Sequence, residues 1–333
     1  MKILVAMSGG VDSSVAALLL KNQGHEIAGC TLLLSEDDSQ GADEICAYLN
    51  IPHMVIDCRE QFKEQVKAYF LSEYEQGRTP NPCVVCNEKM KFQVMLDAAK
   101  ENGYDKIATG HYASIEERNG NLYLAKTKAG KKDQTYFLYR LTAEQLSQIE
   151  FPLSTYTKDE IREIALKNHL PAASKSDSQD VCFICGDYRD FLHENGVFGT
   201  PGDMVYQGEV IARHIGLPHY TIGQRKLGIA WKNPLYVKEI DAKNNCLIVC
   251  DNEELFSNQC LLTDVRLTHP MPTSFPCYIK PRSAAPSEKG MVHLLDNHQA
   301  TVIFETPIRA LTAGQSAVFY SEDDFVLGGG TIS

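Results

Sequence analysis

The sequence predicts an α/β protein that begins with a doubly wound parallel sheet and continues into β-rich parts. Short apolar segments alternate with helix-forming segments as far as residue 110. A loop rich in Gly and Ser separates the first apolar segment from the first helical one. From Gly196 onward, helical segments become rare, and short alternating segments are separated by Gly, Pro and Asn. We therefore expect an α/β domain over 1–195, a small linking domain over 196–260 and a C-terminal β-barrel over 261–333.

The N-terminal elements follow from apolar runs and their breakers. Residues 3–7 are too few for a helix and rich in strand formers, whereas an Ala- and Leu-rich run continues from Val11 to Gly24. Further strands are expected at 26–34, 53–57 and 106–110, and further helices at 41–49, 60–74 and 88–100. Because ligands bind at the carboxyl ends of such strands, the Gly/Ser loop, Leu32 and Gly110 should share one edge of the sheet.

The pattern changes after Gly110. Residues 112–125 alternate around Asn119-Gly120-Asn121, which predicts a hairpin. Helices are expected at 142–149 and 158–169, and later strands at 235–241, 246–250, 277–280, 299–304 and 317–320.

The Gly/Ser loop is Ser8-Gly9-Gly10-Val11-Asp12-Ser13-Ser14. Glycines at a strand-to-helix turn let the backbone approach a ligand, and the hydroxyls and free N–H groups of the helix start then face one oxyanion. This pattern predicts a pyrophosphate cradle; the alternative is a Gly-Ser turn without a ligand. A P-loop kinase motif would carry Lys before the last Ser or Thr, whereas here Asp12 is suited to Mg²⁺ bound with phosphates.

Composition limits the class of protein. The chain has 333 residues, of which 44% are hydrophobic and 23% charged, so two or three domains with large cores are expected. There is no apolar run of ~20 residues and the N-terminus does not resemble a signal peptide, so we expect a cytoplasmic protein without membrane contact. The net charge of −11 argues against a general nucleic-acid coat, but RNA binding remains open where Lys and Arg gather locally.

Eleven cysteines in such a chain do not indicate a disulfide framework. Four of them form two C-x-x-C pairs: Cys83 and Cys86 lie in a proline-held loop expected over 79–87, at the start of a helix, and Cys182 and Cys185 lie further along the chain. The pairs are compatible with a structural zinc site, an iron–sulfur cluster, or two catalytic thiols of which one carries sulfur as a persulfide. Buried, inert thiols are expected for the other seven, which are Cys30, Cys46, Cys58, Cys246, Cys250, Cys260 and Cys277.

The Gly/Ser loop resembles the signature of the PP-loop ATP pyrophosphatases, whose adenine nucleotide alpha hydrolase-like domains adenylate an oxygen of a substrate. Over nearly its whole length the chain resembles the bacterial tRNA-specific 2-thiouridylases, also called tRNA-uridine 2-sulfurtransferases. The matching strings are residues 7–14 (MSGGVDSS), 79–82 (TPNP) with Cys86-Asn87, 108–112 (ATGHY), 132–138 (KDQTYFL), 178–184 (SQDVCFI), 219–226 (HYTIGQRK) and 328–332 (GGGTI).

This resemblance implies ATP-dependent adenylation of the 2-oxo group of the wobble uridine of tRNA, followed by sulfur transfer. Cys182 would carry the persulfide, and Cys86 would open it to leave a Cys86–Cys182 disulfide. A persulfide sulfur donor protein is implied as a partner. The implied ATP contacts are Ala6, Met7, Ser8, Gly9, Gly10, Val11, Asp12, Ser13, Leu32 and Gly110, and the implied tRNA contacts are Asn81, Pro82, Cys83, His111, Lys132, Asp133, Gln134, Arg282, Ser283 and Gln315.

The chain departs from the family at two positions. Cys83 stands where many members carry the Asp proposed as acid/base, and a thiol is a different proton donor. Cys185 is not expected from the family either. Together they complete the two pairs, so a 4Fe–4S cluster held by Cys83, Cys86, Cys182 and Cys185 is an alternative, in which the cluster would hold the sulfur to be transferred.

Basic segments supply candidate RNA contacts. Lys126, Lys128, Lys131 and Lys132 form one run; Arg225-Lys226 and Lys280 with Arg282 are similar. Trp231 would either stack on a base or pack within the middle domain. Two other functions remain open at this point: a PP-loop ligase that adenylates a small molecule, and a zinc-stabilised tRNA-binding protein without turnover.

Overall fold

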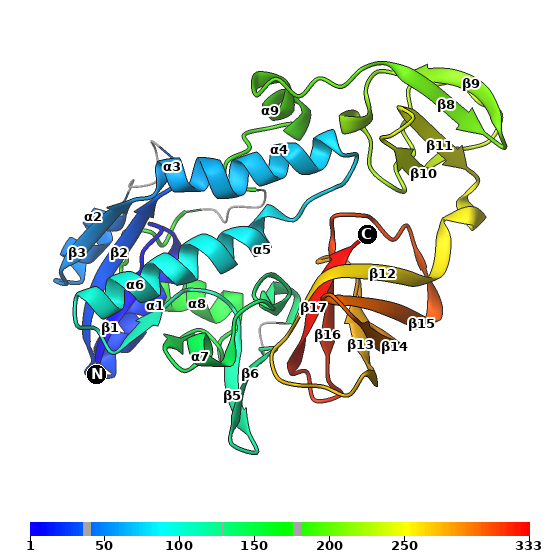
Figure 1. The fold of residues 1–333 in the computed structure, drawn as a ribbon. Helices are drawn as coiled ribbons and strands as arrows, with labels where there is room; N and C mark the ends of the chain where they lie inside the picture. Colours follow the sequence, from blue (N-terminus) through cyan, green and yellow to red (C-terminus); the bar gives the residue numbers. More distant parts are fainter. Residues whose placement is uncertain (36–40, 128–129, 176–180) are drawn as a thin grey trace. The chain divides into compact units, whose positions relative to one another are not determined.

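The structure is a computed structural model that describes residues 1–35, 41–127, 130–175 and 181–333. The chain divides into two compact units (Figure 1). The first comprises Met1–Val66, Cys83–Asp180 and Asp323–Leu327, and the second comprises Lys67–Pro82, Val181–Glu322 and Gly328–Ser333.

A parallel sheet forms the centre of the first unit. Over the described residues it has five strands in the order β3-β2-β1-β4-β7, and every neighbouring pair is parallel. The strands are β1 (Lys2–Ala6), β2 (Glu26–Leu33), β3 (His53–Asp57), β4 (Lys106–Ala108) and β7 (Ile149–Glu150). The strand order reverses between β1 and β4, so the loops that leave these two strands diverge and leave room for a ligand at their carboxyl ends. The predicted doubly wound sheet is confirmed.

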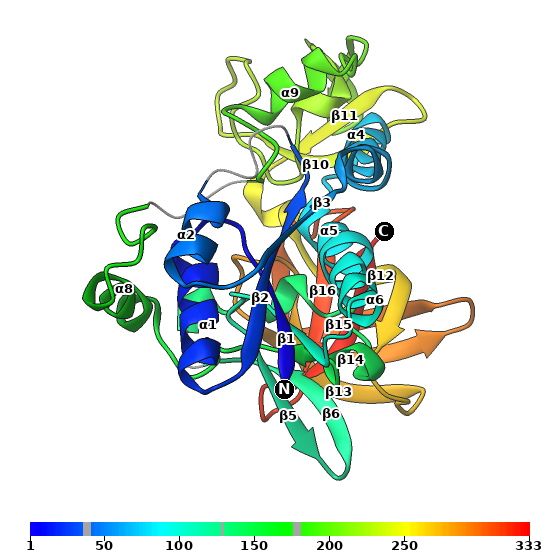
Figure 2. The same ribbon diagram turned by 90° about the vertical axis from the view of Figure 1, so that its left-hand side faces the viewer.

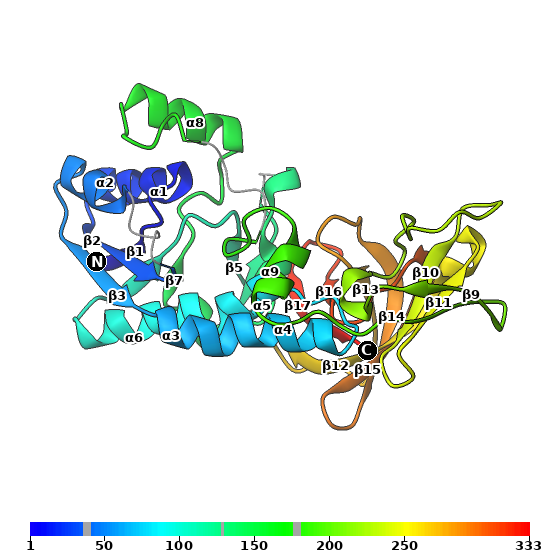
Figure 3. The same ribbon diagram turned by 90° about the horizontal axis from the view of Figure 1, so that it is seen from above.

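Helices cover both faces of this sheet. Figures 2 and 3 show α1 (Val11–Asn22), α2 (Ala42–Tyr48) and α8 (Lys158–Lys167) on one face, with α1 between the sheet and α8, and α6 (Gln93–Glu101) on the other. Ile3 and Val5 of β1, Val15 of α1 and Ile161 of α8 are fully buried together in one core. Burying each such side chain contributes about 1.5–3 kcal/mol, so this core fixes the start of α1 against β1.

The helix that carries the first cysteine pair begins earlier than the sequence predicts. It runs through α5 (Pro82–Cys86), the π-helical η2 (Asn87–Phe92) and α6. The prediction of a loop up to residue 87 was therefore wrong, because Pro82 stands at the first helical position, where its fixed φ and missing N–H fit. Another helical stretch contains α3 (Arg59–Phe62), the π-helical η1 (Lys63–Lys67) and α4 (Ala68–Glu75).

The predicted hairpin is present as β5 (Ser114–Arg118) and β6 (Asn121–Ala125). Asn119 and Gly120 have φ of 53° and 78°, as a type I′ turn requires. The helix expected at 142–149 is shorter: α7 covers Ala143–Leu146, and Ile149 belongs to β7 instead. Short 3₁₀ segments η3 (Gly130–Lys132) and η4 (Thr135–Phe137) precede it.

The second unit contains a small sheet and a barrel. Over the described residues, α9 (Tyr188–Glu194) precedes a four-stranded sheet in the order β10-β11-β8-β9, and six strands close a barrel in the order β12-β15-β14-β13-β16-β17. The bounds are β8 (Gly202–Tyr206), β9 (Glu209–His214), β10 (Tyr236–Asp241), β11 (Cys246–Cys250), β12 (Phe256–Leu267), β13 (Ser274–Lys280), β14 (Glu288–Leu295), β15 (Gln299–Arg309), β16 (Ser316–Tyr320) and β17 (Val326–Ile332), with 3₁₀ segments η5 (Leu217–His219) and η6 (Asn252–Leu255). The predicted β-rich linking part and C-terminal barrel are confirmed.

Candidate nucleotide and sulfur-transfer site

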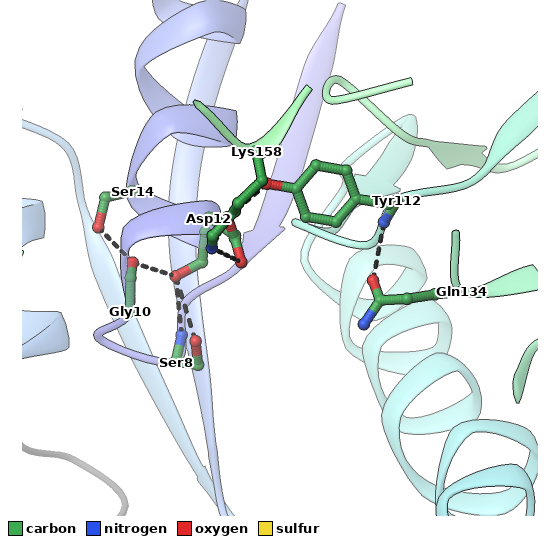
Figure 4. Close-up of polar contacts among 8 residues, drawn as sticks. Ser8, Gly10, Asp12, Ser14, Tyr112, Gln134 and Lys158 are labelled. Carbon is green, nitrogen blue, oxygen red and sulfur yellow. Dashed lines mark hydrogen bonds and ion pairs between the residues drawn. The ribbon is translucent and has the colours of Figure 1, made fainter. Parts of the chain in front are cut away.

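The Gly/Ser loop connects β1 to α1 and is held by its own hydroxyl groups (Figure 4). The hydroxyl oxygens of Ser8 and Ser13 lie 3.2 Å apart, and the Ser13 and Ser14 hydroxyls donate to the Gly10 carbonyl at 3.1 and 2.7 Å. Gly9 has φ of 72°, a left-handed conformation that favours glycine. The first-turn N–H groups of α1 have no acceptor within the helix, so they are available to an anion at this edge of the sheet.

Gly110 and Gly10 both lie at the start of α1, but a side chain at each would meet different surroundings. A Cβ on Gly110 would lie 2.8 Å from the backbone of Asp12 and Ser13, so glycine is required where the segment after β4 packs against the start of α1. A Cβ on Gly10 would meet only the Ser8 hydroxyl, at 3.4 Å, so the protein itself leaves space there. Leu32 lies on β2, the strand beside β1, as the sequence predicts. The expected meeting of the loop, Leu32 and Gly110 at one edge is therefore present.

Asp12 is bound by two side chains that the sequence analysis did not select. The Lys158 ammonium lies 2.7 and 2.8 Å from the two carboxylate oxygens, and the Tyr112 hydroxyl donates to one of them at 2.8 Å (Figure 4). The Lys158 side chain is 12% exposed and that of Asp12 34%. A third group, the Lys175 ammonium, donates to the Gly9 carbonyl at 3.0 Å.

These groups fit a nucleoside triphosphate with Mg²⁺. Magnesium takes one or two protein carboxylates and completes its shell with phosphate oxygens and water, and the Asp12 carboxylate is exposed enough to supply one ligand. Lys158, Lys175 and the helix start provide positive charge for phosphates. The uncrowded position at Gly10 would admit a phosphate that a side chain would exclude.

Tyr112 is fixed by a residue that the family resemblance assigns to tRNA. The Gln134 side-chain oxygen accepts from the Tyr112 backbone N–H, and the Gln134 backbone N–H donates to the Tyr112 carbonyl, both at 2.8 Å. Asp133 accepts from the Thr127 and Thr135 backbone N–H groups. Both side chains thus hold the local fold, while Lys132 is exposed and Lys128 lies outside the described residues.

His111, also assigned to tRNA, is packed within the first unit. One ring nitrogen lies 2.9 Å from the Thr109 hydroxyl, and the ring centroid lies 5.6 Å from that of Phe92. Burial, together with the nearby positive Lys91, lowers the pKa of His111 to about 3. The imidazole is therefore neutral at physiological pH and can offer a hydrogen bond but no charge.

The two cysteine pairs lie in different surroundings. Cys83 and Cys86 belong to the first unit, where Cys83 is partly exposed and Cys86 only 4% exposed. The neighbouring Asn87 donates to the Phe137 carbonyl at 3.1 Å and fixes the helix just after Cys86, while its side-chain oxygen has no partner among the described residues.

Cys182 and Cys185 belong to the second unit and are both exposed. They flank Phe183 and Ile184, which pack on α4; the rings of Phe183 and Phe70 have centroids 5.4 Å apart. The Ile184 N–H donates to the Val181 carbonyl at 2.9 Å, which makes the segment a turn. Packing of Phe183 and Ile184 on α4 holds this turn in place, and both thiols of the turn are exposed to solvent. Residues 178–180 of the matching string lie outside the described residues.

The other seven cysteines have raised thiol pKa values because of burial. The pKa is about 12 for Cys30, Cys260 and Cys277 and about 11 for Cys46 and Cys250, and it is raised for Cys58 and Cys246. Cys246 and Cys260 are only partly buried, whereas the other five are buried, as predicted.

In the second unit, Gln315 holds the segment that leads to the first cysteine pair. Its amide donates to the Thr79 and Pro80 carbonyls at 2.9 and 3.3 Å, and the Thr79 N–H donates to the Ala313 carbonyl at 2.9 Å. Arg282 donates to the Ala310 carbonyl at 2.7 Å and to the Thr312 hydroxyl. Asn81, Pro82 and Ser283 are described, and none of the three is fully exposed.

The described part of the chain contains neither a metal-ligand cluster nor a membrane-spanning helix. There, no three His, Cys, Asp or Glu side chains gather as metal ligands. In the same residues, no helix has the length and apolar character needed to span a bilayer.

The first unit defines a class of protein: a doubly wound parallel sheet with a Gly/Ser loop at its switch point. Residues 1–186 match the family described as "tRNA methyl transferase HUP domain", residues 189–251 its "PRC-barrel domain", and residues 257–332 an "Aminomethyltransferase beta-barrel domain".

Curated relatives give the family more closely. The chain is 43% identical over 340 residues to the tRNA-specific 2-thiouridylase MnmA of Syntrophomonas wolfei, covering 100% of both chains. It is 44% identical over 347 residues to the protein of the same name from Pelobacter propionicus, covering 100% of this chain and 98% of the relative. The chain belongs to the tRNA-specific 2-thiouridylase family, which confirms the resemblance. A solved 4-thiouridine synthetase–RNA complex with bound ATP aligns with 54% of this chain and 44% of its own, at a TM-score of 0.39 and 20% identity.

Proposed function

We propose that this protein is a cytoplasmic enzyme that uses ATP to replace the 2-oxygen of the wobble uridine of tRNA with sulfur. The observation that carries the proposal is the full-length similarity to relatives named tRNA-specific 2-thiouridylase. The geometry at the Gly/Ser loop supports it, because adenylation needs a pyrophosphate cradle and the loop has the form of one. We keep the proposed domain limits of 1–195, 196–260 and 261–333.

In the activation step, the uridine 2-oxygen attacks the α-phosphorus of ATP and pyrophosphate leaves. Ala6, Met7, Leu32 and Gly110 would surround the nucleotide at the carboxyl edge of the sheet, and the loop from Ser8 to Ser13 would bind the phosphates. Asp12 would hold Mg²⁺, which neutralises phosphate charge. Lys158, now bound to Asp12, is a second cation within reach of this edge. The adenylated oxygen is then a good leaving group.

In the transfer step, the terminal sulfur of a Cys182 persulfide attacks C2 of the adenylated base. The Cys86 thiolate then attacks the Cys182 sulfur; the S–S bond to the transferred sulfur breaks, and its electron pair stays on that sulfur. Collapse to the thiocarbonyl expels AMP with the former 2-oxygen. A Cys86–Cys182 disulfide remains, which a thiol reductant must reduce before the next cycle, and a persulfide-bearing donor protein must reload Cys182.

Cys83 and the residues assigned to tRNA complete the proposal. Asn81, Pro82 and Cys83 would contact the target base, and Cys83 would take the acid/base position. A base that reacts at its 2-oxygen must leave the helical stack, so the pocket has to accept an extruded pyrimidine. His111, Lys132, Asp133, Gln134, Arg282, Ser283 and Gln315 would contact the rest of the tRNA.

The test uses a tRNA transcript, ATP, Mg²⁺ and a persulfide source. Thiolated tRNA is measured by mercury-gel retardation and AMP by chromatography. Cys182→Ser should abolish thiolation while tRNA-dependent AMP formation remains, and Asp12→Ala should abolish both. A Cys182→Ser enzyme that thiolates normally would contradict the persulfide route. AMP formation unaffected by tRNA would instead favour a ligase acting on a small molecule, and tRNA binding without any AMP would favour a binding protein.

A second route has one observation in its favour: the four cysteines at positions 83, 86, 182 and 185 have the spacing of cluster ligands. In that route the four thiolates would hold a 4Fe–4S cluster, and the cluster would hold the sulfur to be transferred. Protein purified without oxygen would then contain about four iron atoms per chain and absorb near 400 nm. Iron-free protein with full activity excludes this route.

A further inference from the structure

The loop between η5 and β10 in the second unit presents the only tryptophan of the chain on its surface. Leu227 and Leu235 are 7% and 4% exposed and anchor the loop in the core of the small sheet. Trp231, between these anchors, is 46% exposed and meets the Tyr206 ring edge-on at a centroid distance of 5.8 Å. The buried leucines on either side therefore fix a loop segment whose indole is exposed to solvent.

Beside this indole lies an open pocket of about 310 Å³, lined by Arg225, Trp231, Lys232 and the apolar anchors. Arg225, Lys226 and Lys232 are exposed. Within the described residues, none of these three cations has a side-chain hydrogen bond or ion pair. Two acidic groups of the same unit are engaged by other side chains: Asp251 accepts from the Tyr206 hydroxyl and Glu254 pairs with Lys238.

This combination is unusual in a chain with a net charge of −11. Three uncompensated cations around an exposed aromatic face attract a polyanion that also carries flat rings. Single-stranded RNA has both properties: proteins that bind it stack unpaired bases on aromatic side chains and bind the backbone with Arg and Lys. An acidic peptide would satisfy the charges but leave the indole without a stacking partner.

We propose that this pocket is a second RNA-binding surface, in which an unpaired base of the tRNA stacks on Trp231 while Arg225 and Lys232 bind its flanking phosphates. The inference rests on the proposed function, because tRNA is the substrate there. It adds a contact in the small sheet to those assigned to the barrel and the first unit. Its role is to hold the tRNA, so the chemical step itself does not require it.

The single tryptophan makes a direct test possible. Titration of the full-length protein with a tRNA transcript, without ATP, should change the fluorescence of Trp231. Arg225→Ala combined with Lys232→Ala should weaken tRNA binding at least about tenfold and lower the slope of log affinity against log salt by about one to two. Trp231→Ala should weaken binding at least about fivefold, whereas Trp231→Phe, which keeps a stacking face, should stay near wild type. Lys238→Ala, which removes a cation already paired with Glu254, is the matched control.

Filter binding and thiolation assays separate this inference from the proposed function. If tRNA binds and is thiolated but Trp231 fluorescence does not change and the Arg225/Lys232 variant binds like wild type, the second surface is refuted and the proposed function stands. If polyglutamate changes the fluorescence and tRNA does not, the surface binds acidic protein and the inference is also refuted. If tRNA neither binds nor reacts, the proposed function fails, and this inference fails with it.

Discussion

Replacement of Lys158 by Met should separate the charge of this lysine from its packing. Its ammonium contacts both oxygens of Asp12, at 2.7 and 2.8 Å, from a side chain that is 12% exposed. Breaking a fully buried pair costs about 3–5 kcal/mol and breaking an exposed one about 0.2–1 kcal/mol. Because the Asp12 side chain is 34% exposed, we expect Lys158→Met to lower the free energy of unfolding by about 1–2 kcal/mol.

A double-mutant cycle with Asp12→Asn isolates the pair. In urea unfolding, the two changes together should cost about 1–2 kcal/mol less than the sum of the single changes. Lys167→Met, on the exposed end of the same helix, is the control and should change stability by less than about 0.5 kcal/mol. If the lysine transfers its hydrogen bonds to phosphate when ATP binds, AMP formation should fall about ten- to hundredfold in Lys158→Met and recover partly in Lys158→Arg. Additive effects in the cycle would refute the coupling, and normal AMP formation would refute the role at the phosphates.

Three further outcomes follow from the same geometry. Gly110→Ala should destabilise the fold by about 1–3 kcal/mol, because its Cβ would lie 2.8 Å from the backbone of α1. Gly10→Ala, by contrast, should keep the wild-type melting temperature and lose ATP binding. Equal melting temperatures for the two variants would contradict this reasoning. Native alkylation at pH 8, followed by mass spectrometry, should modify Cys182 and Cys185 before the seven cysteines with raised pKa; early labelling of Cys30 would contradict the burial argument. Since the folded pKa of His111 is about 3 and the unfolded value about 6.5, the unfolded state binds the extra proton and stability falls as pH drops from 6.5 toward 3, by up to ~1.4 kcal/mol per pH unit. His111→Gln should flatten that part of the pH–stability curve, and an unchanged slope would argue against a neutral, partly buried imidazole.

Strong local patterns made the N-terminal sheet predictable. The apolar runs that predict β1, α1, β2 and β3 coincide with these elements and end at residues that break regular structure, such as Gly24. β7 was not predicted because a strand of two residues is too short to show an alternation of apolar and polar side chains. It is a strand because it pairs with β4. β17 was missed because it contains Gly328, Gly329 and Gly330, which disfavour strands. The barrel requires at least the first of them, since a Cβ at Gly328 would lie 2.1 Å from the Arg266 carbonyl.

The position of the Gly/Ser loop between β1 and α1 could be predicted because all its residues are adjacent in sequence. Lys158 could not, because it reaches Asp12 across 146 residues. One signal was present: Thr157 and Glu160 form a capping box, so Lys158 is the first residue of a helix, where a cation is unfavourable. An anionic partner offsets the cost of a cation at that position, which is about 0.3–1 kcal/mol. The side chain of Asp12 is that partner, and it in turn fixes where α8 begins relative to the loop.

Two glutamines that the family resemblance assigns to tRNA have a second use in the fold. The Gln134 side chain accepts a hydrogen bond from the backbone of Tyr112, and the Tyr112 hydroxyl donates to Asp12 in the Gly/Ser loop. Gln315 holds the carbonyls of Thr79 and Pro80, which directly precede the Asn81-Pro82-Cys83 segment. An RNA group that displaced the Tyr112 N–H from the Gln134 oxygen, or replaced the Thr79 and Pro80 carbonyls as acceptor of the Gln315 amide, would release the loop that the side chain holds. Binding of tRNA and the position of the reactive loops would then be coupled through these amides, and the coupling would act in both directions, because linkage is reciprocal.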